Sequence, residues 1–316
     1  MTTMWDLYTH YVRERWQVYL RRAMGLPAPW TDDQVIAGTK FTNDFRILDA
    51  GTQYLVGVLC AERIPLSEMM MRCFLYRYTN RPEPWEYARS QWGRYPLIED
   101  LESGALIELW RDAPVPVSGN AYQMHVGAQN SGLSRVDWCV GLASQAFTPD
   151  GGAIVIPAHK WRRDGGNYVL PRLLDQWSDA EALFRTLTTL PRCSTFMAQQ
   201  VLTDFTYLPC STMSDSDWVE PGPGSRRGMD LVWPGSREPH GVRLRAAHEY
   251  WQKSIRAPRL SSGHVQDRPL SLMDVQNTFC EFQKYVRRLE SGRTFTPYRP
   301  KNPDETWAGP FLPAHW

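Results

Sequence analysis

Apolar residues recur every three or four positions along most of this sequence, and this spacing limits the fold more than any other feature. In residues 4–24 it aligns Trp5, Tyr8, Val12, Trp16 and Leu20 along one side, as in an amphipathic helix. The same spacing predicts helices over 41–58, 66–79, 178–190, a segment ending at Phe205, 241–256 and 271–290. We therefore predict a mostly α fold, with Thr31 and Ser178 as helix N-caps.

Glycine and proline interrupt this spacing in two regions. Pro114-Val-Pro-Val, glycine pairs at 151 and 165, and Ala153-Ile-Val-Ile-Pro predict loops with a short strand or hairpin between about 110 and 170. Residues 209–240 are rich in Gly, Pro and Ser and predict a long ordered loop, and the Pro-rich, aromatic tail 297–316 is expected to pack over the body. Since neither a repeat nor a boundary is visible, we predict a single helical domain over residues 1–316.

The charge balance limits how this chain could bind nucleic acid. The 316 residues have a formal net charge of +1, which excludes a chain-wide polycation, so a nucleic-acid site must be a local patch. Lysine occurs at only five positions, so 30 of the 35 basic residues are arginine, whose planar fork matches phosphate oxygens and stacks on flat rings. With 14 Trp, 14 Tyr and 11 Phe this suits nucleic acid or a phosphorylated flat ligand, although the bias of a GC-rich genome would give the same composition.

Several classes of protein are excluded by what the sequence lacks. No stretch reaches the roughly 20 apolar residues of a membrane span, and the N-terminus lacks the basic start and apolar run of a signal peptide. The six cysteines are scattered without zinc-ligand spacing. G-x-x-x-x-G-K-[ST], H-E-x-x-H and G-x-S-x-G are all missing, which argues against a P-loop kinase, a metalloprotease and an α/β-hydrolase. We expect a cytoplasmic protein with no membrane segment and no metal site.

Two polar patterns could carry chemistry in the first two thirds of the chain. On a helix over 41–56, one face would hold Asn43, Arg46, Asp49 and Gln53, an array that could bind a base edge or a phosphate, or form a solvated face. Two short helices joined after Leu190-Pro191 are typical of a helix-hairpin-helix, although Arg192-Cys193 stands where glycine is usual. Asp204 in the second of them could be a general base or the cap of a neighbouring loop.

Two more patterns lie in the last third. Gly222, Gly224 and Gly228 would let the backbone approach a ligand, and Ser225, Arg226 and Arg227 would bring a hydroxyl and two cations to that point, so this segment predicts a pyrophosphate or DNA-phosphate cradle. The alternative is a turn with solvated arginines. In residues 270–288 an apolar seam faces a polar side, which would be a solvated helix face or the lining of a polar cleft. That polar side consists of Asp274, Asn277, Glu281, Lys284 and Arg288.

These segments together resemble a known family. Their order is Pro29-Trp-Thr-Asp-Asp, Phe41-Thr-Asn-Asp-Phe-Arg with Asp49, Phe74-Leu-Tyr-Arg-Tyr-Thr-Asn80, Leu190-Pro191 to Asp204, Gly222-Pro-Gly-Ser-Arg-Arg-Gly228, and Asp274 to Lys284-Tyr285. The chain resembles the α-glutamyl/putrescinyl-thymine pyrophosphorylases of bacterial viruses, and is similar to the helical domain associated with 5-hydroxymethyl-deoxyuridine DNA kinases. The resemblance covers about residues 5 to 300 and implies DNA-glycosylase-like helical character.

The resemblance implies a transferase that hypermodifies thymidine in the DNA of a virus-infected bacterium. The substrates would be double-stranded DNA carrying 5-(pyrophosphoryloxymethyl)deoxyuridine and a free amino acid or polyamine, which displaces pyrophosphate. Arg226 and Arg227, with Lys284, would hold the leaving group, and Asp204 or else Glu281 would take the proton from the amine. Asn43 and Arg46 would contact the flipped base. Further contacts to substrate or DNA are expected from Asp49, Gln53, Ser225 and Asn277.

Two other functions fit the same residues. One is a non-catalytic or kinase-associated DNA-binding module, which would need a kinase partner because this chain has no P-loop. The other is a helix-hairpin-helix DNA glycosylase, which would leave abasic sites. No cofactor is expected, apart from a magnesium ion that could accompany the pyrophosphate.

Overall fold

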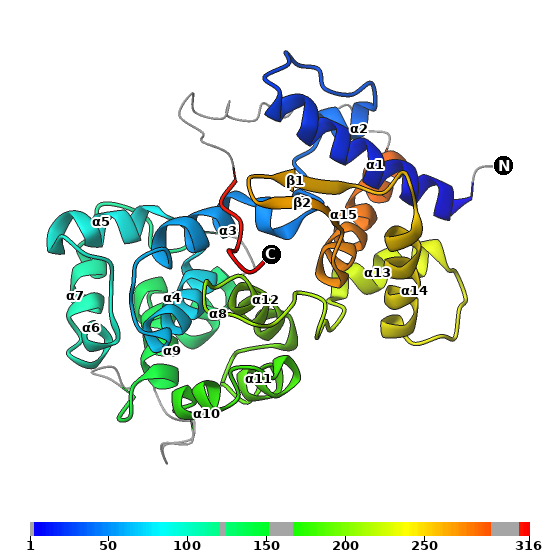
Figure 1. Ribbon diagram of the computed structural model, residues 1–316. Helices are drawn as coiled ribbons and strands as arrows, with labels where there is room; N and C mark the ends of the chain where they lie inside the picture. Colours follow the sequence, from blue (N-terminus) through cyan, green and yellow to red (C-terminus); the bar gives the residue numbers. More distant parts are fainter. Residues whose placement is uncertain (1–2, 120–123, 152–166, 292–309) are drawn as a thin grey trace. The chain divides into compact units, whose positions relative to one another are not determined.

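The computed structural model describes residues 3–119, 124–151, 167–291 and 310–316, and its chain divides into two compact units (Figure 1). Unit 1 comprises Met1–Asp49, Asp215–Ala314 and Trp316, and unit 2 comprises Ala50–Ser214 and His315. The mostly α prediction is confirmed, since helices dominate both units. The prediction of a single domain over residues 1–316 stays a prediction. In the described ranges, no helix is both long enough and apolar enough to cross a bilayer.

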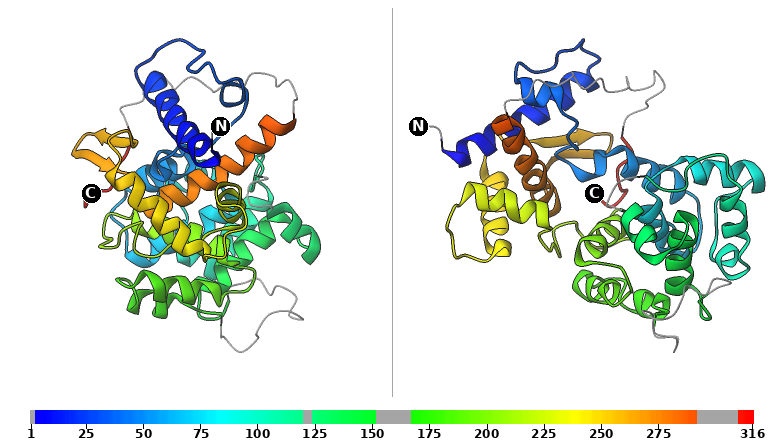
Figure 2. Two further views of the ribbon diagram at one scale, coloured as in Figure 1. Left: turned by 90° about the vertical axis from the view of Figure 1, so that its right-hand side faces the viewer. Right: turned by 180° about the vertical axis from the view of Figure 1, so that it is seen from behind.

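Unit 1 is a helical bundle with one small hairpin. Tyr8 of its first helix stacks on Phe279 of its last, with ring centroids 4.2 Å apart, and the Tyr8 hydroxyl lies 2.7 Å from Thr278 Oγ1. Two further helices, α13 and α14, pack against that last helix (Figure 2). The elements are α1 (Met4–Ala23), α2 (Gln34–Gly38), the 3₁₀ turn η1 (Arg46–Leu48), α13 (Pro223–Val232), α14 (His240–Lys253), β1 (Arg259–Ser262), β2 (Val265–Pro269) and α15 (Leu272–Ser291).

Unit 2 is entirely helical in its described part and is centred on one buried helix. In α4 (Leu66–Thr79) every residue from Met69 onward is buried, and this helix packs against α9 and α12. The other elements are α3 (Ala50–Tyr54), the π-helix η2 (Leu55–Leu59), α5 (Glu83–Trp92), α6 (Ile98–Glu102), α7 (Ala105–Arg111), α8 (Met124–Ser131), α9 (Arg135–Phe147), α10 (Leu170–Asp175), α11 (Ala180–Thr188) and α12 (Thr195–Thr206).

The two regions expected to be loops contain helices. Residues 110–170 include α8 and α9. The Ser134 side chain caps α9 by accepting the Asp137 N–H at 3.1 Å. The segment Ala153-Ile-Val-Ile-Pro lies outside the described residues. The long loop expected over 209–240 is interrupted by α13, whose first residue is Pro223, a position where a proline costs no hydrogen bond. The N-caps are Asp33 and Asp179 rather than Thr31 and Ser178.

The one hairpin in the described ranges lies elsewhere. It is the antiparallel pair β1 and β2, which the spacing of apolar residues did not indicate because both strands are short and largely polar. The end of the C-terminal tail packs on this hairpin. His264 Nε2 lies 2.8 Å from the Pro313 carbonyl oxygen, and the Arg268 guanidinium lies 3.4 Å from the ring centre of Trp316. The tail before residue 310 falls outside the described ranges.

Candidate functional site

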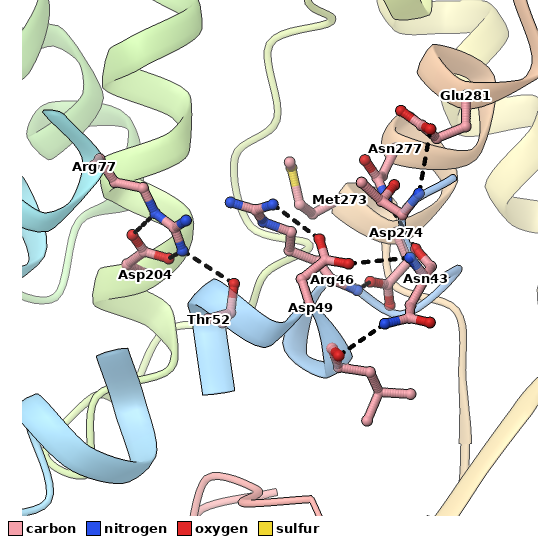
Figure 3. A network of polar contacts seen from close by, with 12 residues as sticks. Asn43, Arg46, Asp49, Thr52, Arg77, Asp204, Met273, Asp274, Asn277 and Glu281 are labelled. Carbon is pink, nitrogen blue, oxygen red and sulfur yellow. Dashed lines mark hydrogen bonds and ion pairs between the residues drawn. The ribbon is translucent and has the colours of Figure 1, made fainter. Parts of the chain in front are cut away.

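The segment expected to be one helix over 41–56 is broken at Phe45 and Asp49. Both residues have extended backbones on either side of η1, and α3 begins only at Ala50. Local polar contacts replace the helical ladder: the Asn43 N–H donates to Asp49 Oδ1 at 3.0 Å, and Asn43 Nδ2 donates to the Leu48 carbonyl at 2.8 Å (Figure 3). The prediction of a polar stripe on one helix face is therefore wrong, although Asn43, Arg46 and Asp49 do lie together.

The first three residues of the polar side of α15, Asp274, Asn277 and Glu281, are buried and hold this segment in place, whereas Lys284 and Arg288 are half-buried. The Arg46 N–H donates to Asp274 Oδ1 at 2.7 Å, and the Arg46 side chain pairs with Asp49 at 3.0 Å. Asn277 Nδ2 donates to Thr42 Oγ1 at 3.1 Å and to the Asn43 carbonyl at 3.0 Å (Figure 3). Asp274 is only 1% exposed, so a solvated face is excluded there. The structure thus brings together residues more than 200 positions apart in the chain.

Three cations are carried by α15 or by elements that pack on it, beside this network. Glu281 Oε2 accepts the Thr42 N–H at 3.3 Å, and its other oxygen pairs with Lys284, whose side chain is 39% exposed. Burial and the Glu281 carboxylate raise the pKa of the neighbouring Cys280 thiol, whereas Lys284, Arg227 and Arg46 oppose that rise. Arg46 belongs to η1 and Arg227 to α13, and both elements pack on α15, which carries Lys284. We call Arg46, Arg227, Glu281 and Lys284 the α15 cluster.

Asp44 is a titratable group in this region that the sequence did not single out. Burial raises its pKa to about 8, Arg15 opposes this, and Asp274 adds to it. Its Oδ2 atom is buried and makes no hydrogen bond to the described part of the chain. Burial and the Asp215 carboxylate likewise raise the pKa of Asp274 to about 7. The available signal was the position of Asp44 between Phe41 and Phe45, on the apolar side of the expected helix.

The cradle expected from Gly222 to Gly228 is not a single site. A Cβ atom on Gly228 would lie 2.2 Å from the Phe279 carbonyl oxygen, and one on Gly224 would lie 2.5 Å from Cys280 Sγ. These two glycines therefore let α13 pack closely on α15, and the expectation that they admit a ligand is wrong. Ser225 is fully buried, and its hydroxyl makes no hydrogen bond to any residue that the structure describes.

Arg226 and Arg227 take different surroundings, as neighbours on a helix do. Arg227 lies between Gly224 and Gly228, which pack against Cys280 and Phe279, and so belongs with the α15 cluster. Arg226 donates from Nε to the Pro221 carbonyl at 2.8 Å and pairs with Glu220, and it lines a pocket of about 420 Å³. Unit 1 therefore carries two candidate anion-binding places, one at the α15 cluster and one at this pocket.

Asp204 and Gln53 belong to unit 2. Asp204 lies fully buried in α12 and forms a two-point ion pair with Arg77 of α4, which also donates to Thr52 Oγ1 at 3.0 Å (Figure 3). Both carboxylate oxygens are thus engaged by one guanidinium, an arrangement typical of a buried structural pair. Gln53 lies half-buried in α3. The catalytic role expected for Asp204 stays a prediction.

The described residues show no metal-binding group. No three or more His, Cys, Asp or Glu side chains among them are arranged to hold a metal ion. The chemistry available from the α15 cluster is instead that of positive charge beside one carboxylate. Such a site can bind phosphate oxygens and accept a proton.

Comparison with known proteins gives the chain a family. The family model described as "5-hmdU DNA kinase, helical domain" matches residues 2–293. A relative from Bacillus phage SP10, named 5-hmdU DNA kinase, is 26% identical over 243 residues, which cover 73% of this chain and 36% of the relative. The match thus spans about a third of that relative's own length. No solved structure matches the chain significantly. Because the family model extends over nearly all of the sequence, the chain belongs to the family of 5-hmdU DNA kinase helical domains.

Proposed function

We propose that this protein acts in the hypermodification of thymidine in viral DNA, as a transferase that places an amino acid or amine on the 5-methylene carbon of pyrophosphorylated 5-hydroxymethyluracil. The family relation supports a role on DNA that carries 5-hydroxymethyluracil. The observation that carries the transfer itself is the α15 cluster, where Lys284 pairs with Glu281 and where η1 and α13, which carry Arg46 and Arg227, pack on α15. The helix-hairpin-helix and glycosylase-like character remain part of this proposal.

The reaction needs stabilisation of the leaving group and a proton acceptor, and this cluster can supply both. The nitrogen lone pair of the amine attacks the methylene carbon, the C–O bond breaks, and pyrophosphate leaves with the bonding electrons. Arg227, Arg46 and Lys284 would stabilise the charge that develops on the departing oxygens. The proton lost by the amine would pass to Glu281, the carboxylate that pairs with Lys284, whereas both oxygens of Asp204 are engaged by Arg77.

A second function has an observation in its favour. The match to the SP10 kinase covers 36% of that protein, and this sequence contains no P-loop motif, so the helical domain could bind modified DNA for a separate kinase. In that case the α15 cluster would hold the hydroxymethyl or phosphorylated base without turning it over. A glycosylase remains a third candidate, because α11 and α12 are joined by a short turn in which Arg192 has a φ of 60°, where a glycine is usual.

Nucleoside mass spectrometry separates these functions. DNA bearing the pyrophosphorylated base is incubated with the protein, amino acids and polyamines, without ATP. A transferase yields a new nucleoside, whose mass identifies the amine, together with free pyrophosphate. Unchanged nucleosides, with product appearing only when a kinase and ATP are added, would support the module. Abasic sites would identify a glycosylase.

Variants of the cluster test the site assignment. Arg227→Ala should lower turnover by about ten- to a hundredfold, because the lost fork acts on charge that appears only in the transition state. Arg227→Lys should restore part of the rate. Arg256→Ala is the matched control, since Arg256 is an exposed arginine of the same unit outside the cluster. Equal rates for Arg227→Ala and the control would remove Arg227 from the site.

A further inference from the structure

A second place for an anion lies on the surface of unit 1. The pocket of about 420 Å³ is lined by Trp218 to Pro221, Arg226 of α13, and Pro239, His240, Gly241 and Arg245 of α14. We call it the α13–α14 pocket. Its volume falls within the roughly 300–1,000 Å³ of small-ligand sites, large enough for one nucleotide.

The charged side chains of this pocket differ in whether they already have hydrogen-bond or ion-pair partners. Arg226 is held by Glu220 and by the Pro221 carbonyl. His240 lies 3.0 Å from Asp230, which also pairs with Arg243. Arg245 is exposed and, within the described ranges, has no recorded hydrogen bond or ion pair. One guanidinium is thus available to a ligand, and a second can be released from Glu220.

The rest of the lining suits a flat ring attached to an anion. Trp218 is half-buried at the wall, with Pro221 and Pro239 beside it, so much of the lining is rigid and apolar. An indole ring is a stacking surface for any nucleobase. His240 and Gly241 belong to the first turn of α14, where backbone N–H groups and the helix dipole add to the attraction for an anion.

We propose that the α13–α14 pocket binds one nucleotide of a DNA strand, with the phosphate on Arg226 and Arg245 and the base against Trp218. This nucleotide is not the reacting one in the proposed function, because Arg226 lines the pocket whereas Arg227, Glu281 and Lys284 of the α15 cluster do not. The assignment rests on the proposed function only in taking DNA as the substrate. Phosphate chemistry could equally come from a free nucleotide, and the experiment distinguishes these sources.

The test measures binding, not turnover. A fluorescein-labelled oligothymidylate of ten residues is titrated with the full-length protein at several salt concentrations. Arg245→Ala should weaken binding about tenfold and reduce the slope of log K against log salt by about 0.7, the share of one phosphate contact on a single strand. Trp218→Ala should weaken binding by roughly five- to a hundredfold with little change in slope, and Trp218→Phe should restore much of it. Arg256→Ala should leave the slope and the affinity nearly as in the native protein.

Glu220→Gln should change the affinity for oligothymidylate in the opposite direction to Arg245→Ala. It frees Arg226 and removes a negative charge from the pocket, so oligothymidylate should bind several times more tightly. Native affinity and slope in Arg245→Ala, or weaker binding in Glu220→Gln, would overturn the proposal. So would dTMP or inorganic pyrophosphate binding as tightly as the oligonucleotide, because the pocket would then serve a free ligand. Thermal melts confirm that each variant is folded. If the native protein binds the oligothymidylate but transfers no amine to pyrophosphorylated DNA, the proposed function is contradicted and this inference stands.

Discussion

Asn43 uses its side chain inside its own segment, where it bonds the Leu48 carbonyl at 2.8 Å. We expect Asn43→Ala to lower the free energy of unfolding by about 1–2 kcal/mol, since a partly buried carbonyl would lose its donor. Urea unfolding measures the change, and Gln91→Ala, at an exposed amide on α5, is the control. If the Asn43 side chain contacted only the base and did not stabilise the fold, Asn43→Ala would leave the unfolding curve unchanged.

Asp44 should make the stability of the protein depend on pH. Its pKa is about 8 in the folded state and near 4 when unfolded, so the native state favours the protonated form. Its contribution is complete below about pH 4 and is lost as the pH rises to about 8, by up to about 1.4 kcal/mol per pH unit. Asp44→Asn keeps the neutral shape. It should therefore match the native protein near pH 3 and be the more stable of the two at pH 9. Parallel pH profiles for the two proteins would contradict the raised pKa.

For single residues, the sequence predicted which side chains lie near one another better than it predicted how they are arranged. Asn43, Arg46, Asn277, Glu281 and Lys284 were expected near one another, and they are, because polar residues inside an otherwise apolar pattern need partners when buried. The separation of Arg226 from Arg227 could not be predicted, since it depends on which face of α13 meets α15. Asp44 was missed because adjacent aromatic residues suggested an apolar surface.

Helix α13 depends on two glycines for its distance from α15. Gly228→Ala should destabilise the protein by about 2–4 kcal/mol, because the new methyl group would meet the Phe279 carbonyl, which belongs to a backbone that cannot move aside. Gly224→Ala should cost less, since Cys280 can change rotamer. In contrast, Gly241→Ala has open space in α14 and should stabilise the protein by about 0.5–1 kcal/mol. Denaturant midpoints rank the three variants, and equal losses at 228 and 241 would exclude the packing argument.

Periodicity located the elements that bury one continuous face. The spans of α1, α4 and α15 agree with it to within one or two residues, because their apolar residues follow the helical repeat without interruption. It failed over 41–49, where Asp49 and Asn43 offer the backbone other partners than a helical ladder. It also failed at α13, because the glycines that allow close packing on α15 are residues typical of loops. The buried polar side of α15 follows from tertiary packing that no helix pattern contains.

The whole molecule is nearly neutral, yet we expect its affinity for DNA to depend strongly on salt. A local group of cations releases counterions regardless of net charge, and three phosphate contacts would weaken binding roughly 40-fold between about 50 and 200 mM salt. Titrating unmodified duplex DNA across that range by fluorescence anisotropy gives the slope. A flat profile would mean that the arginines of this chain do not meet the phosphate backbone.

Unit 2 interrupts unit 1 along the chain, and this has a consequence for the order of events during synthesis. Residues 42–49 are synthesised early. Asp274, which accepts the Arg46 N–H, is synthesised 228 residues after Arg46. At about 5–20 residues per second this delay is roughly 10–50 s. Through that interval the apolar side of α1, including Tyr8, waits without its stacking partner Phe279. Chaperones have time to act on the nascent chain, and a translation product that stops before α15 contains residues 50–214 of unit 2 but lacks Glu281 and Lys284 of the α15 cluster.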